Sequence, residues 1–178
     1  MRSFKTEGII IKRKNFGEAD RFLTVLTPRY GKIKILAKGV RKISSRRSSH
    51  IELLNLSYLS VHESKLPILT EVEAINHFEG LKNDLDKAAY AFYVCELIDG
   101  LLAEHQENRL VYDLLRQTLY DLEIDPDPRR RIKRFEEEML ILLGFWPRGR
   151  VFVEDQSEFI ENIMERRIKT KRILPSSF

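Results

Sequence analysis

Hydrophobic and polar residues alternate along five short segments within the first 76 residues of the chain. In residues 32–38, Ile33, Ile35 and Ala37 fall on one face, whereas the lysines fall largely on the other. A period of two residues is typical of strands with one buried face. With turn residues between the segments, the pattern predicts strands over residues 5–14, 20–27, 32–38, 52–63 and 67–76.

After these segments the hydrophobic period changes to three and four residues, which is typical of amphipathic helices. Apolar stripes run through residues 85–102 and 110–122. A third helix is expected to begin after Asp127, because Asp is a favourable N-cap and Pro128 fits the first helical position. A last helix, capped by Ser157, is expected to lead into a basic tail.

The two patterns together predict an α+β protein. Five strands within about 75 residues, joined by short turns and one longer basic loop, suit a small barrel, and the five-stranded OB-fold is the leading candidate. We therefore expect an OB-fold nucleic-acid-binding domain over residues 1–79. An all-helical domain with a basic C-terminal helix is expected over residues 80–178.

Positive charge gathers in the strand-rich part of the chain. Residues 1–47 hold 14 of the 31 Lys and Arg residues and three acids, whereas residues 81–128 hold four bases and eleven acids. Such a density of cations fits a groove for nucleic-acid phosphates, although charge does not separate DNA from RNA and a solvated face is the plainer alternative. The candidate phosphate-binding residues are Lys12, Arg13, Lys14, Arg21, Lys32, Lys34, Lys38, Arg41, Lys42, Arg46 and Arg47.

Further side chains are candidates for weaker roles in nucleic-acid binding. Phe16 and Tyr30 lie in predicted turns and are candidates for base stacking, whereas Phe22 has apolar neighbours and is expected in the core. An arginine triplet opens a predicted helix, where cations oppose the helix dipole. This triplet and the tail supply candidate secondary contacts, for which a solvated surface is the alternative: Arg129, Arg130, Arg131, Arg166, Arg167, Lys169, Lys171 and Arg172.

The motifs of common enzyme classes are missing from the sequence. It contains no Walker loop, no glycine-rich dinucleotide fingerprint and no metalloprotease His pair. Cys95 is the only cysteine, and four scattered histidines lack ligand spacing, so no metal, cofactor or catalytic residue is expected. The chain shows neither a signal-peptide pattern nor a membrane-spanning apolar run, so we expect it in the cytoplasm.

Several motifs of the chain resemble those of the RecO family of bacterial recombination mediators. The N-terminal ones are Gly17-Glu18-Ala19-Asp20, Tyr30-Gly31-Lys32, and Ala37-Lys38-Gly39-Val40-Arg41 followed by Ser44. The helical ones are Tyr93 with Glu96-Leu97, and Phe135-Glu136 leading to Leu143-Gly144-Phe145-Trp146-Pro147. The resemblance covers residues 4–147 well, and residues 158–174 are similar to the closing helix of the family.

This resemblance implies a function beyond what composition alone indicates. It implies binding of single- and double-stranded DNA, annealing of complementary strands, and help in loading RecA onto DNA covered by the single-stranded-DNA-binding protein SSB. The implied partners are the SSB C-terminal tail, RecR and, indirectly, RecA, in a nucleoid-associated setting. The alternatives are an RNA-binding OB-fold protein and a basic protein-interaction adaptor.

The chain departs from the family pattern at one place. Many members carry a four-cysteine zinc element just after the Gly-Phe-x-Pro stretch, where this chain has Arg148-Gly149-Arg150-Val151. Four thiolate ligands cannot come from Cys95 alone, so no zinc is expected. We interpret the chain as a short form that lacks this element.

Overall fold

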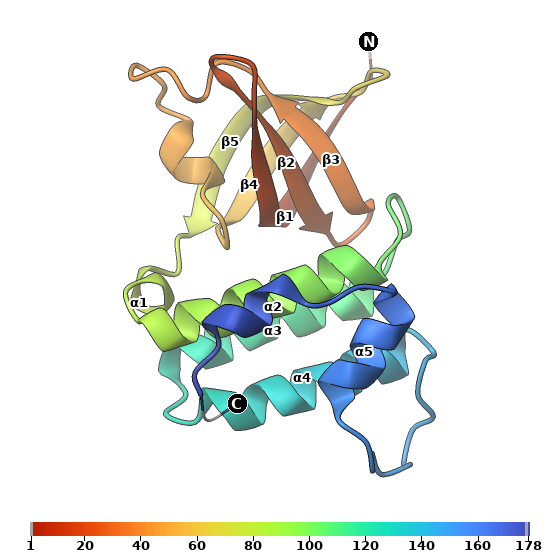
Figure 1. Ribbon diagram of the computed structural model, residues 1–178. Helices are drawn as coiled ribbons and strands as arrows, with labels where there is room; N and C mark the ends of the chain where they lie inside the picture. Colours follow the sequence, from red (N-terminus) through yellow and green to blue (C-terminus); the bar gives the residue numbers. More distant parts are fainter. Residues whose placement is uncertain (1, 177) are drawn as a thin grey trace. The chain divides into compact units, whose positions relative to one another are not determined.

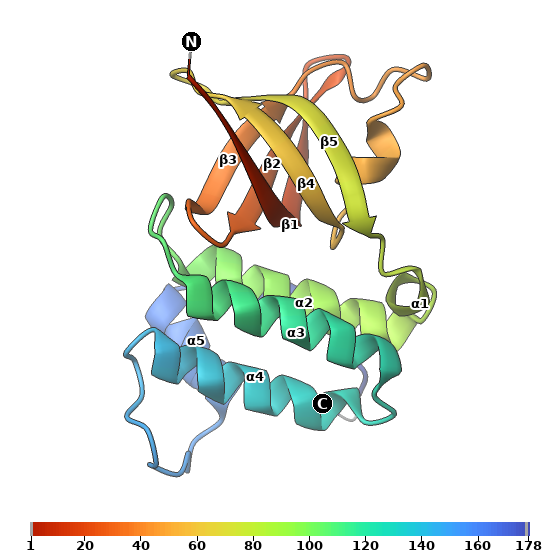
Figure 2. The same ribbon diagram turned by 180° about the vertical axis from the view of Figure 1, so that it is seen from behind.

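The computed structural model describes residues 2–176 and 178, which form two compact units. The first unit holds residues 2–77 and 102–109 and contains the strands, as Figures 1 and 2 show. The second unit holds the described residues of 78–101 and 110–178, most of them in helices. Strands followed by helices confirm the predicted α+β class.

The strands close into a barrel in the order β1-β2-β3-β5-β4. Strands β3 and β5 pair in parallel, whereas the other neighbours are antiparallel. This arrangement confirms the predicted five-stranded OB-fold. The strands are β1 (Ser3–Phe16), β2 (Asp20–Thr27), β3 (Gly31–Ala37), β4 (Leu56–His62) and β5 (Ile68–Asn76).

The fourth strand begins later than predicted. A short 3-10 helix, η1 (Ser48–Ile51), precedes it, and Leu54 has a φ of 72°, outside the strand region. Leu54 and Asn55 instead hydrogen-bond the backbone of Ile10, where β1 carries a bulge. Residues 52–55 therefore support the bend in β1 rather than extend β4.

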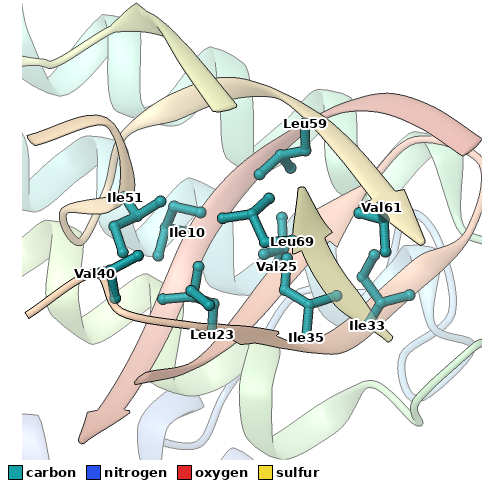
Figure 3. Close-up of a cluster of buried hydrophobic side chains, with 11 residues drawn as sticks. Ile10, Leu23, Val25, Ile33, Ile35, Val40, Ile51, Leu59, Val61 and Leu69 are labelled. Carbon is teal, nitrogen blue, oxygen red and sulfur yellow. The ribbon is translucent and has the colours of Figure 1, made fainter. Parts of the chain in front are cut away.

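The barrel interior is filled by aliphatic side chains from all five strands. Figure 3 shows Ile10, Leu23, Val25 and Ile35 pointing toward one another, and each has no exposed surface. Val40 and Ile51, from the loop after β3 and from η1, complete the same cluster. The loop after β3 is therefore anchored in the core at both ends, which fixes the position of its basic residues.

A segment far along the chain belongs to the barrel unit. His105 N–H donates a hydrogen bond to the Lys32 carbonyl over 2.9 Å, and Lys32 forms an isolated bridge with Glu104. Gly31 approaches the backbone of Gln106 so closely that a Cβ atom would lie 2.1 Å from its carbonyl oxygen. Only glycine fits this position, which also has a φ of +64°.

Helix α2 is the most buried element of the helical unit. It contacts α4, α5 and η2, and nine of its residues are buried, as expected for a helix that is apolar on most sides. The elements of this unit are α1 (Glu79–Lys82), α2 (Leu85–Leu101), α3 (Arg109–Ile124), α4 (Pro128–Leu142), α5 (Gln156–Met164) and η2 (Lys169–Ile173).

Several predicted helix details were wrong. Leu85 and Leu110, at the starts of the predicted stripes, are 86% and 63% exposed because they face solvent in the first turn. Helix α4 begins at Pro128 as predicted, but Asp127 makes no capping hydrogen bond. Asp155 caps α5 in place of Ser157, because its carboxylate accepts the N–H of Ser157 over 2.8 Å.

Candidate nucleic-acid interface

The basic loop after β3 folds around an open hollow of about 720 Å³. Lys38, Lys42, Arg46 and Arg47 line it, with Asp20 as the one acid among the lining residues. The Asp20 carboxylate accepts the N–H of Gly39 over 2.7 Å and is thus committed to the loop backbone. The hollow therefore has a strong excess of positive charge and suits phosphate groups.

Two arginines of the loop hold its shape. The Arg47 guanidinium donates to the carbonyls of Lys38 (2.6 Å) and Leu69 (3.3 Å). The Arg41 guanidinium donates to the Gly17 carbonyl over 3.0 Å, in the turn between β1 and β2. Both side chains were predicted as phosphate contacts, and the structure adds a backbone-bracing role to each.

The other three cations of the loop do not hydrogen-bond its backbone through their side chains. Within residues 2–176 and 178, the ammonium groups of Lys38 and Lys42 and the guanidinium of Arg46 make no hydrogen bond or ion pair. All three residues are exposed. They are therefore the cations of the loop that a phosphate can engage without breaking an internal contact.

A second group of predicted residues lies on the outer face of β1, β2 and β3. Lys12 is opposite Thr24, and Thr24 is opposite Lys34, so the three side chains share one face of the sheet. Lys14 lies on the same face, opposite Phe22. The structure thus brings Lys12, Lys14 and Lys34 together on one face of the sheet.

Arg13 and Arg21 converge on an acid from the segment before β4. Both form ion pairs with Glu52, at 3.7 Å for Arg21, and Arg21 also donates to the Asn15 side chain over 3.1 Å. Burial and then the charge of Arg13 lower the pKa of the Arg21 guanidinium, although arginine stays charged in proteins. Their positive charge is partly neutralised inside the barrel unit.

The prediction for Lys32 was wrong. Lys32 is only 6% exposed, because the segment with Glu104 and His105 lies beside this end of β3. Strand alternation places Lys32 on the polar face with Lys34, but it carries no information about a later segment. Lys32 is therefore excluded from the interface.

The aromatic residues also differ from expectation. Phe22, predicted in the core, points outward, and its ring lies 4.7 Å from that of Phe16, centroid to centroid. Tyr30 instead packs against the barrel core and against Phe4, at a centroid distance of 4.1 Å. Phe16 thus remains a stacking candidate, and Phe22 replaces Tyr30 as the second.

The outer face of β4 and β5 has the opposite charge. Tyr58 lies opposite both Glu7 on β1 and Glu73 on β5, so these three side chains share one face. Glu71 is a neighbour on β5 and accepts the Ser60 hydroxyl over 3.1 Å. This face disfavours phosphates and leaves the β1–β2–β3 face and the adjoining loop as the candidate interface.

Four of the eight secondary basic candidates form ion pairs within the helical unit: Arg131, Arg166, Arg167 and Lys171. Arg131 forms an ion pair with Asp121 at 2.9 Å, so its side chain is 11% exposed. In the tail, Arg167 and Lys171 pair with Glu161 at 3.3 and 4.0 Å. Arg129, Arg130, Lys169 and Arg172 are exposed, and the Arg167 side chain is 92% exposed despite its ion pair.

Glu96 on α2 binds the tail through hydrogen bonds and an ion pair. Its carboxylate accepts the N–H groups of Lys169 (2.9 Å) and Thr170 (2.8 Å), and Arg166 pairs with it at 2.7 Å. Burial raises the pKa of Glu96, but these hydrogen bonds outweigh it and lower the pKa to about 2. The Arg166 guanidinium thus has a structural function in the helical unit, whereas Lys169 contributes only its backbone N–H and its side chain is exposed.

The described residues show no sign of a metal site, a reactive thiol or a membrane-spanning helix. No group of three or more His, Cys, Asp or Glu side chains could hold a metal ion among residues 2–176 and 178. Cys95 is buried, which raises the pKa of its thiol to about 12 and makes it unreactive. None of the helices within the described part of the chain is long and apolar enough to span a membrane.

Comparisons with known proteins agree with this architecture. Residues 1–78 match the family model "Recombination protein O N terminal", and residues 82–156 match "Recombination protein O C terminal". Among curated relatives, a protein of Roseiflexus sp. (strain RS-1) is 37% identical over 82% of this chain and 52% of its own length. A Dehalococcoides mccartyi protein is 39% identical over 81% of this chain and 57% of its own length.

A third relative, from Listeria monocytogenes serotype 4b, is 35% identical over 80% of this chain and 56% of its own length. All three relatives carry the name "DNA repair protein RecO". The chain thus spans little more than half the length of the curated relatives it matches. Both domain models match in order and together cover most of the sequence, so the chain belongs to the RecO family.

Proposed function

We propose that this protein mediates DNA repair and recombination by binding, without covalent chemistry. It binds single- and double-stranded DNA, anneals complementary strands and assists RecA loading on SSB-covered DNA. Residues 1–79 act as the nucleic-acid-binding domain and residues 80–178 as the helical domain. The proposal is supported by the hollow in the loop after β3, whose shape is held by the hydrogen bonds of Arg47. Lys38, Lys42 and Arg46 line this hollow, and their charged groups make no internal hydrogen bond or ion pair in the described residues.

The geometry of the loop supports binding with little sequence preference. Phosphate contacts fix the position of a strand and carry no base information. Lys38, Lys42 and Arg46 on the loop can neutralise phosphates of a strand. Two complementary strands held on one cationic surface repel each other less, because their condensed counterions are replaced by protein charges. Annealing follows from this neutralisation.

The proposed protein partners are the SSB C-terminal tail and RecR, with RecA as an indirect partner. Family membership supports them, together with a cytoplasmic, nucleoid-associated location. Four exposed cations of the helical unit, Arg129, Arg130, Lys169 and Arg172, are proposed secondary DNA contacts.

The test is annealing of complementary DNA strands coated with the cognate SSB, with and without the protein. We expect acceleration by the natural chain and none by the triple variant Lys38→Glu, Lys42→Glu, Arg46→Glu. Arg41 and Arg47 stay unchanged because they brace the loop backbone. An unaltered circular-dichroism melt of the variant confirms that the fold survives.

A matched control variant separates the effect of losing the hollow's cations from the effect of the change in net charge. The variant Lys5→Glu, Arg29→Glu, Lys65→Glu changes the charge by the same amount at exposed positions of the barrel unit that do not line the hollow. We expect this control to retain annealing. Equal loss in both variants would refute the hollow as the interface.

Binding to matched RNA and DNA strands tests the alternative classes. Tighter binding to RNA would replace the DNA proposal by an RNA-binding one. Negligible affinity for either at moderate salt would point to a protein-interaction adaptor.

A further inference from the structure

The outer face of β1 and β2 carries two aromatic rings in contact. Phe16 is 50% exposed, and its ring meets that of Phe22 at an interplanar angle of 54°. Leu23 and Val25 point into the core, so the strand alternation turns Phe22 outward. Phe22 is partly buried, so most of the exposed aromatic surface of the pair belongs to Phe16.

Cations surround this aromatic pair. The Lys34 ammonium lies 5.0 Å from the centroid of the Phe22 ring, a cation–π distance. Lys14 is the cross-strand neighbour of Phe22 on the other side. Asp20 lies opposite Phe16, but its carboxylate is bound to the Gly39 N–H. The two rings therefore lie between lysines whose ammonium groups can reach phosphates.

Rings flanked by cations match the chemistry of an unpaired nucleotide. A base has an apolar π-face that stacks on an aromatic ring, and its phosphate binds the neighbouring ammonium groups. In a duplex the base faces are stacked on one another and are not available. The arrangement thus distinguishes single strands from double strands by the exposure of base faces.

We propose that Phe16 and Phe22 form a stacking platform for unpaired nucleobases, with Lys14 and Lys34 holding the adjoining phosphates. The platform gives the barrel a preference for single strands over duplexes that the loop cations alone do not supply. This inference rests on the proposed function, because it assigns a nucleotide class to the same interface.

The experiment compares affinities for three ligands by fluorescence anisotropy. These are an oligothymidylate of about 16 nucleotides, the upper end of OB-fold site sizes, an abasic strand with the same phosphates, and a DNA duplex of equal length. The protein variants are the natural chain and Phe16→Leu, Phe22→Leu, which keeps apolar bulk and removes the aromatic faces. Tyr58→Leu is the control, because Tyr58 is 47% exposed on the acidic face.

We expect the double variant to bind oligothymidylate about 5- to 100-fold more weakly. Its affinity for the abasic strand and the duplex should stay within about twofold, because no phosphate contact is lost. The natural chain should bind the abasic strand as weakly as the double variant binds oligothymidylate. Tyr58→Leu should bind all three ligands like the natural chain.

Two results would overturn the inference. Unchanged oligothymidylate affinity in the double variant would show that the rings only pack. An equal loss for all three ligands would show that the rings support the surface rather than stack on bases. Failure of the proposed function looks different, because the natural chain would then bind none of the ligands.

Discussion

The hydroxyl group of Tyr93 on α2 donates a hydrogen bond of 2.5 Å to the carboxylate of Glu136 on α4, and both residues are buried. Lys133, one turn earlier on α4, is 3.4 Å from the same carboxylate. Both members of this pair occur in the motifs by which the sequence resembles its family. Their function in this chain is to join two helices through a charged group in the core.

Removing the hydroxyl group should destabilise the helical unit. We expect Tyr93→Phe to lower the free energy of unfolding by about 1–3 kcal/mol, since the buried carboxylate loses a donor. Urea unfolding followed by the fluorescence of the single tryptophan, Trp146, measures this change. A loss below about 0.5 kcal/mol would contradict a structural role for the bond.

Replacing Glu136 by Gln should change the free energy of unfolding by an amount that depends on pH. Burial raises the pKa of Glu136 above its usual value, although Lys133 and Tyr93 lower it in part. The natural chain therefore loses stability, relative to Glu136→Gln, as the pH rises from about 4.5 through the raised pKa. Paired urea titrations over this range should show the variant gaining relative stability with pH, and the opposite trend would refute the assignment.

The contacts of Glu96 should make stability depend on pH in the opposite direction from Glu136. The pKa of Glu96 is lowered to about 2, so its contribution is complete above the unfolded value of about 4.5 and is lost as the pH falls toward 2. We expect Glu96→Gln to cost about 1–2 kcal/mol at pH 7, less than the full pKa shift implies because solvent screens part of the carboxylate. The difference between the two proteins should shrink steadily between pH 4.5 and 2.

Gly31 should tolerate no side chain. A Cβ atom would meet the carbonyl oxygen of Gln106 at 2.1 Å, so Gly31→Ala is expected to lower the stability of the barrel unit by about 3 kcal/mol or more. Gly17→Ala is the matched control, because it also has a positive φ of +57° but meets no atom within 4 Å. Thermal unfolding by circular dichroism should show only a loss of about 1–2 kcal/mol for this control.

Two neighbouring cations of the loop should respond differently to truncation. Lys42→Ala should weaken DNA binding and reduce the salt slope by about 1 without changing the melting temperature. Arg47→Ala should lower the melting temperature as well, because the carbonyls of Lys38 and Leu69 lose their donor. Identical behaviour of the two variants would show that Arg47 does not brace the loop.

The barrel could be predicted because its core follows a local rule. Alternation within each strand identifies Ile33, Ile35 and Ala37 as inward residues, and the structure confirms it. Applied to β2, the same rule places Phe22 outward, since Leu23 and Val25 are inward, but the apolar neighbours of Phe22 led to the wrong expectation that it lies in the core. For Phe22, strand alternation was a better predictor of side-chain direction than its apolar character.

Other features depend on contacts that no local pattern contains. Lys32 is buried because residues near Glu104 lie beside it. The bracing roles of Arg41 and Arg47 depend on carbonyls of the β1–β2 turn and of β5. Charge counts therefore predicted a basic surface correctly, but they could not separate its structural arginines from its free cations.

The opposed charges of the two barrel faces limit how a strand can run. The row of Glu7, Tyr58 and Glu73 disfavours a polyanion on one side of the barrel. If the β1–β2–β3 face binds DNA as proposed, a strand that continues around the barrel meets this acidic row. We therefore expect a bound strand to leave the barrel at the edge of the β1–β2–β3 face instead of wrapping around it.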